Sequence, residues 1–270
     1  MKILLVNNKR IKNTLLMAEK ISGQLKAQGI EVFIDSSAIE VCHEAFNAII
    51  VLGGDGTMIR AARQYLEHNV PVLGVKMGTV GFLSNINADE LEAYLDRFVR
   101  SDYGIEERMM LEVRIFRGED LIQSVFSLNE ISIKSKSSRM ISMDINIDGK
   151  EHALYRGDGI IIATPTGSTA YSLSSGGPIT DPELEVFVMT PITSYLLSKR
   201  PMVINAHKDI KLFPVRCEEA VISIDGQVKI DWDENFTIEV KMAKHKLKMV
   251  RLKEQHFFQA IEKRLQRHQQ

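Results

Sequence analysis

The first hundred residues alternate short apolar runs with amphipathic stretches. Apolar runs of strand length lie at residues 3–6, 32–34, 48–52 and 72–75. Between and after them, apolar residues recur near helical spacing at 14–28, 57–66 and 88–99. Runs that are apolar on both faces are typical of parallel strands, and this alternation of strand and helix predicts βαβ units. We therefore expect an α/β N-terminal domain with a mostly parallel sheet over residues 1–101.

The pattern changes near residue 101, where strand-like runs begin to follow one another without long helices. These runs lie at 112–116, 125–134, 142–147, 153–163, 202–205, 210–213, 220–224 and 236–241. Asp148-Gly149 and Asp225-Gly226 stand where tight hairpin turns belong, because both residue types tolerate positive φ. We expect a β-rich, β-sandwich-like C-terminal domain over 102–250. An amphipathic stretch at 256–267 indicates a helix that docks on the protein, with a partner-binding helix as the alternative.

Composition narrows the class of protein. The 270 residues carry 34 Lys and Arg against 35 Asp and Glu, so the formal net charge is −1. Such a balance argues against non-specific binding to nucleic acid or to anionic membranes. The two cysteines, Cys42 and Cys217, make neither a disulfide framework nor a paired zinc site, and the seven histidines are scattered. No signal peptide or membrane span is visible, so we expect a cytoplasmic protein with no nucleic-acid partner, no membrane association and no dedicated metal site.

The sharpest local feature is Gly53-Gly54-Asp55-Gly56-Thr57, directly after the apolar run at 48–52. Glycines permit positive φ and remove Cβ atoms, so backbone N–H groups can approach a phosphate closely. The N-terminus of the following helix would face the same anion. No Lys precedes a Ser or Thr in the Walker A pattern, and Ile59 breaks the dinucleotide fingerprint. The loop therefore predicts a phosphate site of another kind.

Asp55 is unexpected in such a loop, because a carboxylate repels a phosphate. It becomes useful if it holds a metal ion or accepts the proton of an attacking hydroxyl. A capping Asp in a strand-to-helix turn is an equally good explanation from spacing alone. A second glycine loop, at 74–82, follows the next strand, and the two loops could form one cleft.

The β-rich part holds a second group of polar residues. Asn129-Glu130 interrupts an apolar run, and Arg156-Gly157-Asp158-Gly159 precedes another. The segment 164–172, TPTGSTAYS, is then followed by Gly176-Gly177-Pro178. Hydroxyls, amides and carboxylates at this density can bind ribose hydroxyls or a pyrophosphate. Taken alone, the same residues would also make ordinary polar turns.

In these motifs, in this order and spacing, the sequence resembles the NAD kinases over about residues 1–227. The resemblance rests on GGDGT at 53–57, GTVGFL at 78–83, Asn129-Glu130 and TPTGSTAYS at 164–172. GGDGT alone is weak, because diacylglycerol kinases, sphingosine kinases and phosphofructokinases carry close relatives of it. TPTGSTAY together with Asn-Glu is far more specific.

The resemblance implies transfer of the ATP γ-phosphate to the 2′-hydroxyl of the adenosine ribose of NAD. Asp55 matches the catalytic aspartate of the family, and Gly53, Gly54, Gly56 and Thr57 would line the phosphates. The residues that match NAD contacts are Asp55, Gly56, Phe82, Asn129, Glu130, Arg139, Arg156, Asp158, Thr166, Thr169, Ala170, Tyr171, Ser172, Leu173, Ser174, Thr193 and Gln227. The resemblance also implies Mg²⁺ carried with ATP, a homodimer or homotetramer, and a final segment, 251–270, that returns to the first domain.

Two other functions share part of this pattern. A lipid kinase of the diacylglycerol or sphingosine type would share the glycine loop and a hydroxyl acceptor. It would need a membrane-binding surface, and only the tail, with Lys263, Arg264 and Arg267, offers one. A non-enzymatic dinucleotide sensor would bind the nucleotide without turnover, and the presence of Asp55 argues against it.

Overall fold

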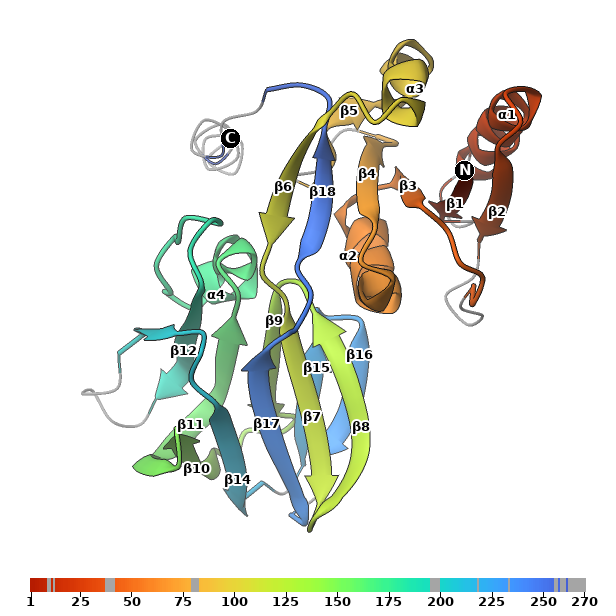
Figure 1. Cartoon of the computed structure of the whole chain (residues 1–270). Helices are drawn as coiled ribbons and strands as arrows, with labels where there is room; N and C mark the ends of the chain where they lie inside the picture. The colour runs from red at the N-terminus through yellow and green to blue at the C-terminus, as the bar shows by residue number, and fades with distance from the viewer. Residues whose placement is uncertain are drawn as a thin grey trace. The chain divides into compact units, whose positions relative to one another are not determined.

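A computed structural model of the chain describes residues 1–8, 11, 13–36, 42–78, 83–194, 200–217, 219–232, 234–254, 257 and 261, without the side chains of 151–153. The chain divides into two compact units (Figure 1). Unit 1 comprises Met1–Glu107 and Leu247–Gln270, and unit 2 comprises Arg108–Lys246. Each unit has its own sheet and its own core.

Unit 1 is built on a seven-stranded sheet of order β2-β1-β3-β4-β18-β6, with β5 paired to β4. Its strands are β1 Lys2–Asn7, β2 Glu31–Asp35, β3 Ala48–Gly53, β4 Pro71–Lys76, β5 Ile86–Asn87, β6 Gly104–Arg108 and β18 Leu247–Arg251. Strands β1 to β5 pair in parallel, as does β18 with β4. The mostly parallel sheet is therefore confirmed, and it gains a strand from a distant part of the chain.

In the described part of unit 1 up to residue 254, three α-helices accompany this sheet: α1 Thr14–Ala27, α2 Asp55–Tyr65 and α3 Leu91–Val99. Helix α1 buries Ala18, Ile21 and Leu25 in a core that it shares with the strands, as its apolar spacing predicts. Helix α2 begins two residues before the predicted start at 57, because Gly54 is its N-cap. Asp55 consequently lies in the first helical turn. The predicted docking helix at 256–267 lies outside the described residues, apart from Phe257 and Ile261.

Unit 2 is built on an eleven-stranded sheet of order β16-β15-β9-β11-β10-β14-β17-β7-β8, with β12 paired to β11 and β13 to β12. Its strands are β7 Leu111–Arg117, β8 Asp120–Ser127, β9 Glu130–Ser135, β10 Ile141–Ile147, β11 Lys150–Ala163, β12 Val186–Ser194, β13 Met202–Asn205, β14 Ile210–Arg216, β15 Ala220–Ile224, β16 Val228–Trp232 and β17 Phe236–Met242. The sheet curls around one core that includes Tyr155, Phe187 and Trp232. The β-rich second domain is confirmed.

The predicted single strand at 125–134 is wrong. The chain forms β8 and β9 instead, and Leu128 and Asn129 lie between them. The break arises because the Asp225 carboxylate accepts hydrogen bonds from the backbone N–H groups of Leu128, Asn129 and Glu130. The sequence pattern did not predict β5, β6, β12, β16 or β18. Strands β5, β6, β16 and β18 contain no long apolar run, whereas β12 begins with the apolar run 186–189, which was overlooked.

The two predicted hairpin turns are confirmed. Asp148 and Gly149 have φ of 54° and 74° between β10 and β11. Asp225 and Gly226 have φ of 50° and 66° between β15 and β16. Positive φ at both central residues is the geometry of the tight turns that follow the right-handed twist of paired strands.

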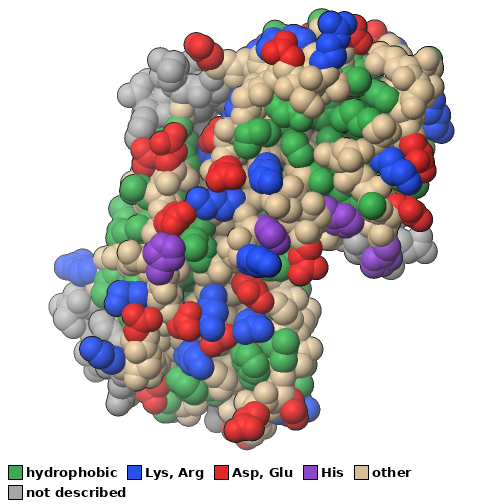
Figure 2. Space-filling view, in the orientation of Figure 1, with side chains coloured by type: hydrophobic (Ala, Val, Ile, Leu, Met, Phe, Trp, Pro, Cys, Tyr) green, Lys and Arg blue, Asp and Glu red, His purple; other side chains and the backbone are tan. Residues whose placement is uncertain are grey.

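No helix among the described residues is long and apolar enough to cross a membrane. Figure 2 shows Lys and Arg side chains interspersed with Asp and Glu over the visible face. That mixture agrees with the near-zero formal charge and gives no broad basic patch on this face.

Candidate functional site

The glycine loop of unit 1 joins a fully buried strand to the start of α2. All six residues of β3 are buried, and Gly54 caps α2 with extended backbone, at φ −98° and ψ −172°. A Cβ on Gly53 would lie 2.4 Å from the Thr57 Oγ1, so only glycine fits against this threonine. Neither Gly53 nor Gly54 has positive φ, so that part of our prediction is wrong for these two residues. The missing side chain is required at Gly53, whereas a Cβ on Gly54 would meet no atom within 4 Å.

Asp55 lies in the first turn of α2, where the helix dipole favours a negative charge. Its Oδ1 accepts a hydrogen bond of 3.1 Å from the Leu83 backbone N–H. The same part of the chain passes close to β4, because a Cβ on Gly74 would lie 2.8 Å from the Leu83 carbonyl oxygen. Asp55 thus links the first glycine loop to the end of the second. Phe82, which we predicted to contact NAD, lies outside the described residues.

A buried ionic network fixes α2 against the neighbouring strands. The Arg60 Nη1 lies 2.6 Å from the Asp35 Oδ2 at the end of β2, and its Nη2 donates to the Asn7 carbonyl oxygen at the end of β1. The Tyr65 hydroxyl also donates to Asp35, at 2.9 Å. Burial, followed by the negative charge of Asp35, raises the pKa of Tyr65, so its hydroxyl keeps its proton. The network holds the middle and the C-terminal end of α2 against the ends of β1 and β2.

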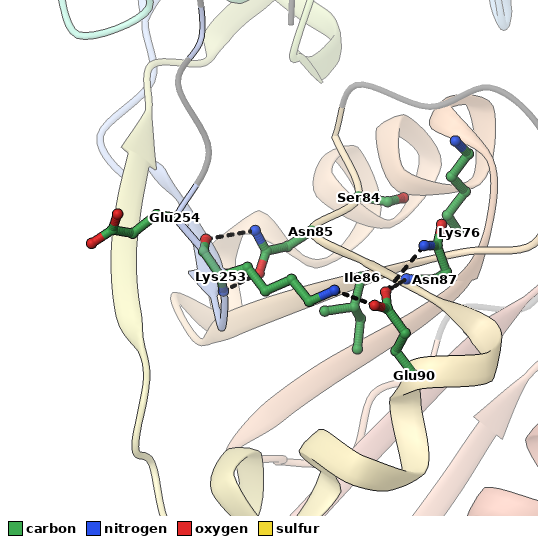
Figure 3. A pocket seen from close by; sticks show the side chains of 8 residues that line it. All are labelled: Lys76, Ser84, Asn85, Ile86, Asn87, Glu90, Lys253 and Glu254. Atoms are coloured by element: carbon green, nitrogen blue, oxygen red, sulfur yellow. Dashed lines mark hydrogen bonds and ion pairs between the residues drawn. The ribbon is translucent and has the colours of Figure 1, made fainter. Parts of the chain in front are cut away.

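A small hollow of about 210 Å³ lies at the same edge of the sheet and is shown in Figure 3. One wall is formed by Lys253 and Glu254 after β18, and Asn85 holds this segment through three hydrogen bonds. The Asn85 Oδ1 accepts from the N–H groups of Leu252 and Lys253, at 2.6 and 3.0 Å, and its Nδ2 donates to the Lys253 carbonyl. The Lys253 ammonium pairs with Glu90, and this hydrogen bond, with one from the Asn87 N–H, lowers the pKa of Glu90. Lys76 lines the opposite side.

In unit 2, Asp225 organises the Asn129-Glu130 segment. Its carboxylate accepts four hydrogen bonds, from the Ser127 Oγ and from the N–H groups of Leu128, Asn129 and Glu130, at 2.7 to 3.2 Å. The Asp225 N–H donates in return to the Glu130 carbonyl at 2.9 Å. Asp225 itself is buried. Gln227 follows two residues later and is exposed.

The TPTGSTAYS segment packs directly on the same backbone. The Thr164 N–H donates to the Asn129 carbonyl at 2.8 Å, and the Gly167 N–H donates to the Thr164 Oγ1 at 3.0 Å. A Cβ on Gly167 would lie 2.0 Å from the Asn129 carbonyl oxygen, so the approach excludes any side chain there. Residues Thr166–Thr169 then form a short 3₁₀ helix and Tyr171–Ser174 form the single-turn helix α4. The structure therefore brings the predicted Asn-Glu pair and the hydroxyl-rich segment together.

Glu130 is a buried carboxylate in this cluster. The Tyr171 backbone N–H donates to it, while its Oε2 has no hydrogen-bond partner among the described residues. Burial, and then the negative charge of Asp225, raise the pKa of Glu130 to about 7. A buried acceptor with an unused lone pair is suited to receiving a hydroxyl from a ligand.

The other predicted NAD contacts of unit 2 form a separate group on β11 and β12. Gly157 pairs with Ser194, which places Arg156 and Asp158 beside Thr193. Strand β11 advances about 3.4 Å per residue, so Asp158 lies roughly 17 Å along it from Ala163, which pairs with Glu130. Arg139 lies on the exposed loop between β9 and β10. Arg156, Asp158, Thr193 and Arg139 are therefore not part of the Glu130 cluster within unit 2.

Sequence reasoning missed two groups that shape these sites. The Arg60–Asp35 pair carried no motif, because its members come from a helix and a strand that only the fold brings together. Asp225 was noticed as a turn residue, and its side-chain role was not anticipated. Among the described residues, no three His, Cys, Asp or Glu side chains are grouped as for a metal ion.

A glycine loop that opens a helix at the carboxyl edge of a parallel sheet, with a carboxylate in its first turn, is typical of an enzyme that handles phosphate groups. Comparison with known proteins identifies the family. The ATP-NAD kinase N-terminal domain matches residues 3–103, and the ATP-NAD kinase C-terminal domain matches residues 128–252. The chain belongs to the NAD kinase family and is a kinase that transfers phosphate to a hydroxyl of NAD.

Individual relatives agree with this assignment. The NAD kinase of Natranaerobius thermophilus is 36% identical over 256 residues, covering 93% of this chain and 90% of the relative. That of Heliobacterium modesticaldum is 39% identical over 220 residues, covering 81% and 78%. The crystal structure of an NAD kinase from Archaeoglobus fulgidus in complex with ATP has a TM-score of 0.75 at 27% identity, with 98% and 99% covered. Yeast NADH kinase complexed with NADH shares the fold, with a TM-score of 0.82 at 23% identity over 98% and 87%.

Proposed function

We propose that this kinase moves the ATP γ-phosphate to the 2′-hydroxyl of the adenosine ribose of NAD, with Asp55 as the group that receives the hydroxyl proton. The observation that carries this role is the position of Asp55 in the first turn of α2, directly after the Gly53-Gly54 loop. A carboxylate there is in the same loop that would hold the donor phosphates. Phosphoryl transfer needs mainly positioning, charge neutralisation and a base or orienting group for the nucleophile.

Unit 1 supplies the donor half of the reaction. Gly53, Gly54, Gly56 and Thr57 would line the phosphates with backbone N–H groups and the helix N-terminus. The Arg60–Asp35 contact supports this arrangement, because it fixes α2 to the ends of β1 and β2. Mg²⁺ would come with the ATP, held mainly by phosphate oxygens.

Unit 2 supplies the acceptor half. Asn129 and Glu130 would hold the adenine and ribose side of NAD, and the free lone pairs of the Glu130 Oε2 support a hydroxyl contact. Thr166, Thr169 and Tyr171 lie in the segment that packs on Asn129 and would contact the dinucleotide. Asp158, with Arg156, would serve the nicotinamide side. A homodimer or homotetramer, a cytoplasmic location and the remaining predicted contacts stay predictions from the resemblance.

The role of Asp55 can be tested with one substitution that keeps the shape of the side chain. Asp55→Asn should lower the rate of ATP-dependent NADP formation by about 10² to 10⁴-fold, the range for loss of a general base. NAD binding, measured by calorimetry, should persist. Asp89→Asn, in the first turn of the short helix before α3, is a matched control in the same unit and should keep normal turnover. Unchanged turnover in Asp55→Asn would exclude this role.

A further inference from the structure

Lys76 lies beside the phosphate loop in the sheet. It is the last residue of β4, and its register partner on β3 is Gly53. Neighbouring parallel strands run about 4.8 Å apart, so the two backbones are in direct contact. The Met77 N–H also donates to the Gly53 carbonyl at 3.2 Å. The Lys76 side chain therefore starts one strand away from the first glycine of the loop.

Lys76 differs from nearby cations because its charge has no partner among the described residues. Arg60 is held by Asp35 at 2.6 Å, and Lys253 is held by Glu90. Lys76 is a half-buried residue, and its ammonium makes no hydrogen bond or ion pair with any residue that the structure describes. In Figure 3 it points away from the Lys253–Glu90 pair. A cation without a counter-charge favours an anionic ligand.

Lys76 also lines a small hollow of about 210 Å³, below the roughly 300–1,000 Å³ of pockets that enclose a drug-sized ligand. The hollow is open to solvent, and the Lys76 side chain points away from the Lys253–Glu90 pair that lines it, so an anion bound by Lys76 need not fit inside the hollow. Glu90 on its far side is already neutralised by Lys253, so it does not cancel the charge of Lys76.

We propose that Lys76 binds the phosphate chain of the donor, next to the backbone N–H groups of the Gly53–Thr57 loop. This inference rests on the proposed function, in which that loop holds the donor phosphates. The loop brings only partial charges and also carries the negative Asp55, whereas a donor triphosphate is a polyanion. A full positive charge on the adjacent strand would offset this repulsion, and a lysine can serve phosphate as a point charge.

The test separates the donor from the acceptor. At fixed ionic strength, Lys76→Met should raise the KM for ATP about tenfold or more, as expected for loss of a hydrogen bond to a charged group. The KM for NAD should stay within twofold. Inorganic tripolyphosphate, which has no nucleoside, is used as the probe for the phosphate chain, and calorimetry should show a similar loss in its affinity. Lys76→Arg should recover most of the ATP affinity.

Lys248→Met is the matched control, because Lys248 lies on β18 opposite Pro71 at the amino end of β4. It should leave both KM values unchanged. An equal rise in both KM values, or the same rise in ATP KM for Lys248→Met, would overturn the proposal. So would unchanged tripolyphosphate binding in Lys76→Met. If the wild-type protein forms no NADP, the proposed function fails, whereas the tripolyphosphate measurement still decides the role of Lys76.

Discussion

Glu130 gives a quantitative prediction because its surroundings oppose its own charge. Its side chain is 6% exposed, and the neighbouring Asp225 is buried and negative. Burial first, and the charge of Asp225 second, raise the pKa of Glu130 from its usual 4.5 to about 7. The Tyr171 N–H acts in the other direction without reversing the result. In the ligand-free protein, ionising Glu130 therefore costs more free energy than ionising an exposed glutamate.

The sign of the effect on stability follows from proton binding. Between pH 4.5 and 7 the folded state holds a proton on Glu130 that the unfolded state releases. The contribution of Glu130 to the free energy of unfolding is therefore fully present below pH 4.5 and is lost as the pH rises to about 7. One pH unit of difference in pKa corresponds to about 1.4 kcal/mol, so the loss at pH 8 approaches about 3 kcal/mol. Glu130→Gln cannot ionise and should not show this loss.

The assay is urea unfolding of ligand-free wild-type protein and Glu130→Gln from pH 5 to pH 8.5. Near pH 5 the two free energies of unfolding should be similar, and at pH 8 the variant should be more stable by up to about 3 kcal/mol. The same variant should bind NAD more weakly.

Glu239→Gln is a control with the opposite sign. Burial alone would raise the pKa of Glu239, but the hydrogen bonds and charges of Lys241 and Lys211 lower it. That variant should be less stable at neutral pH. A difference between wild type and Glu130→Gln that does not change with pH would refute the reasoning.

Two further substitutions test how the unit 2 cluster is held. Asp225→Ala removes the acceptor of four hydrogen bonds and should lower the free energy of unfolding by about 3 kcal/mol or more, with a matching loss of NAD affinity by calorimetry. Wild-type stability in this variant would show that these four hydrogen bonds do not stabilise the fold. Gly167→Ala should weaken NAD binding and stability, because its methyl would lie 2.0 Å from the Asn129 carbonyl oxygen. Gly23→Ala, with open space around the new methyl in α1, should leave NAD binding unchanged and stabilise the helix by about 0.5–1 kcal/mol.

The sequence was most informative where local pattern and fold agree. In unit 1 each predicted parallel strand is a continuous apolar run, and the burial of all six residues of β3 shows why. The position of the glycine loop could be predicted as well, because the loop begins where β3 ends. The start of α2 at Asp55 was missed by two residues because a glycine cap leaves no side-chain signal.

The pattern failed where distant residues decide the local structure. Residues 125–134 are apolar enough for one strand, and the break at Leu128 and Asn129 depends on Asp225, almost a hundred residues away. Nothing within the segment encodes that interaction. The Arg60–Asp35 pair is similar, because each residue alone looks like an ordinary surface charge. Long-range contacts of this kind position α2 within unit 1 and the Asn129-Glu130 segment within unit 2.

Charge counting from sequence fails for the same physical reason. Asp225 and Glu130 each count as one negative charge in the formal total of −1. Asp225 receives four hydrogen bonds on its carboxylate. Burial, and then the charge of Asp225, raise the pKa of Glu130 to about 7, so this carboxyl does not count as a fixed negative charge. In the proposed function, a ligand hydroxyl that donates to Glu130 would favour the ionised form of this carboxylate, so binding would release a proton. Ligand binding would then depend on pH through a carboxylate whose state the fold, and not the sequence, determines.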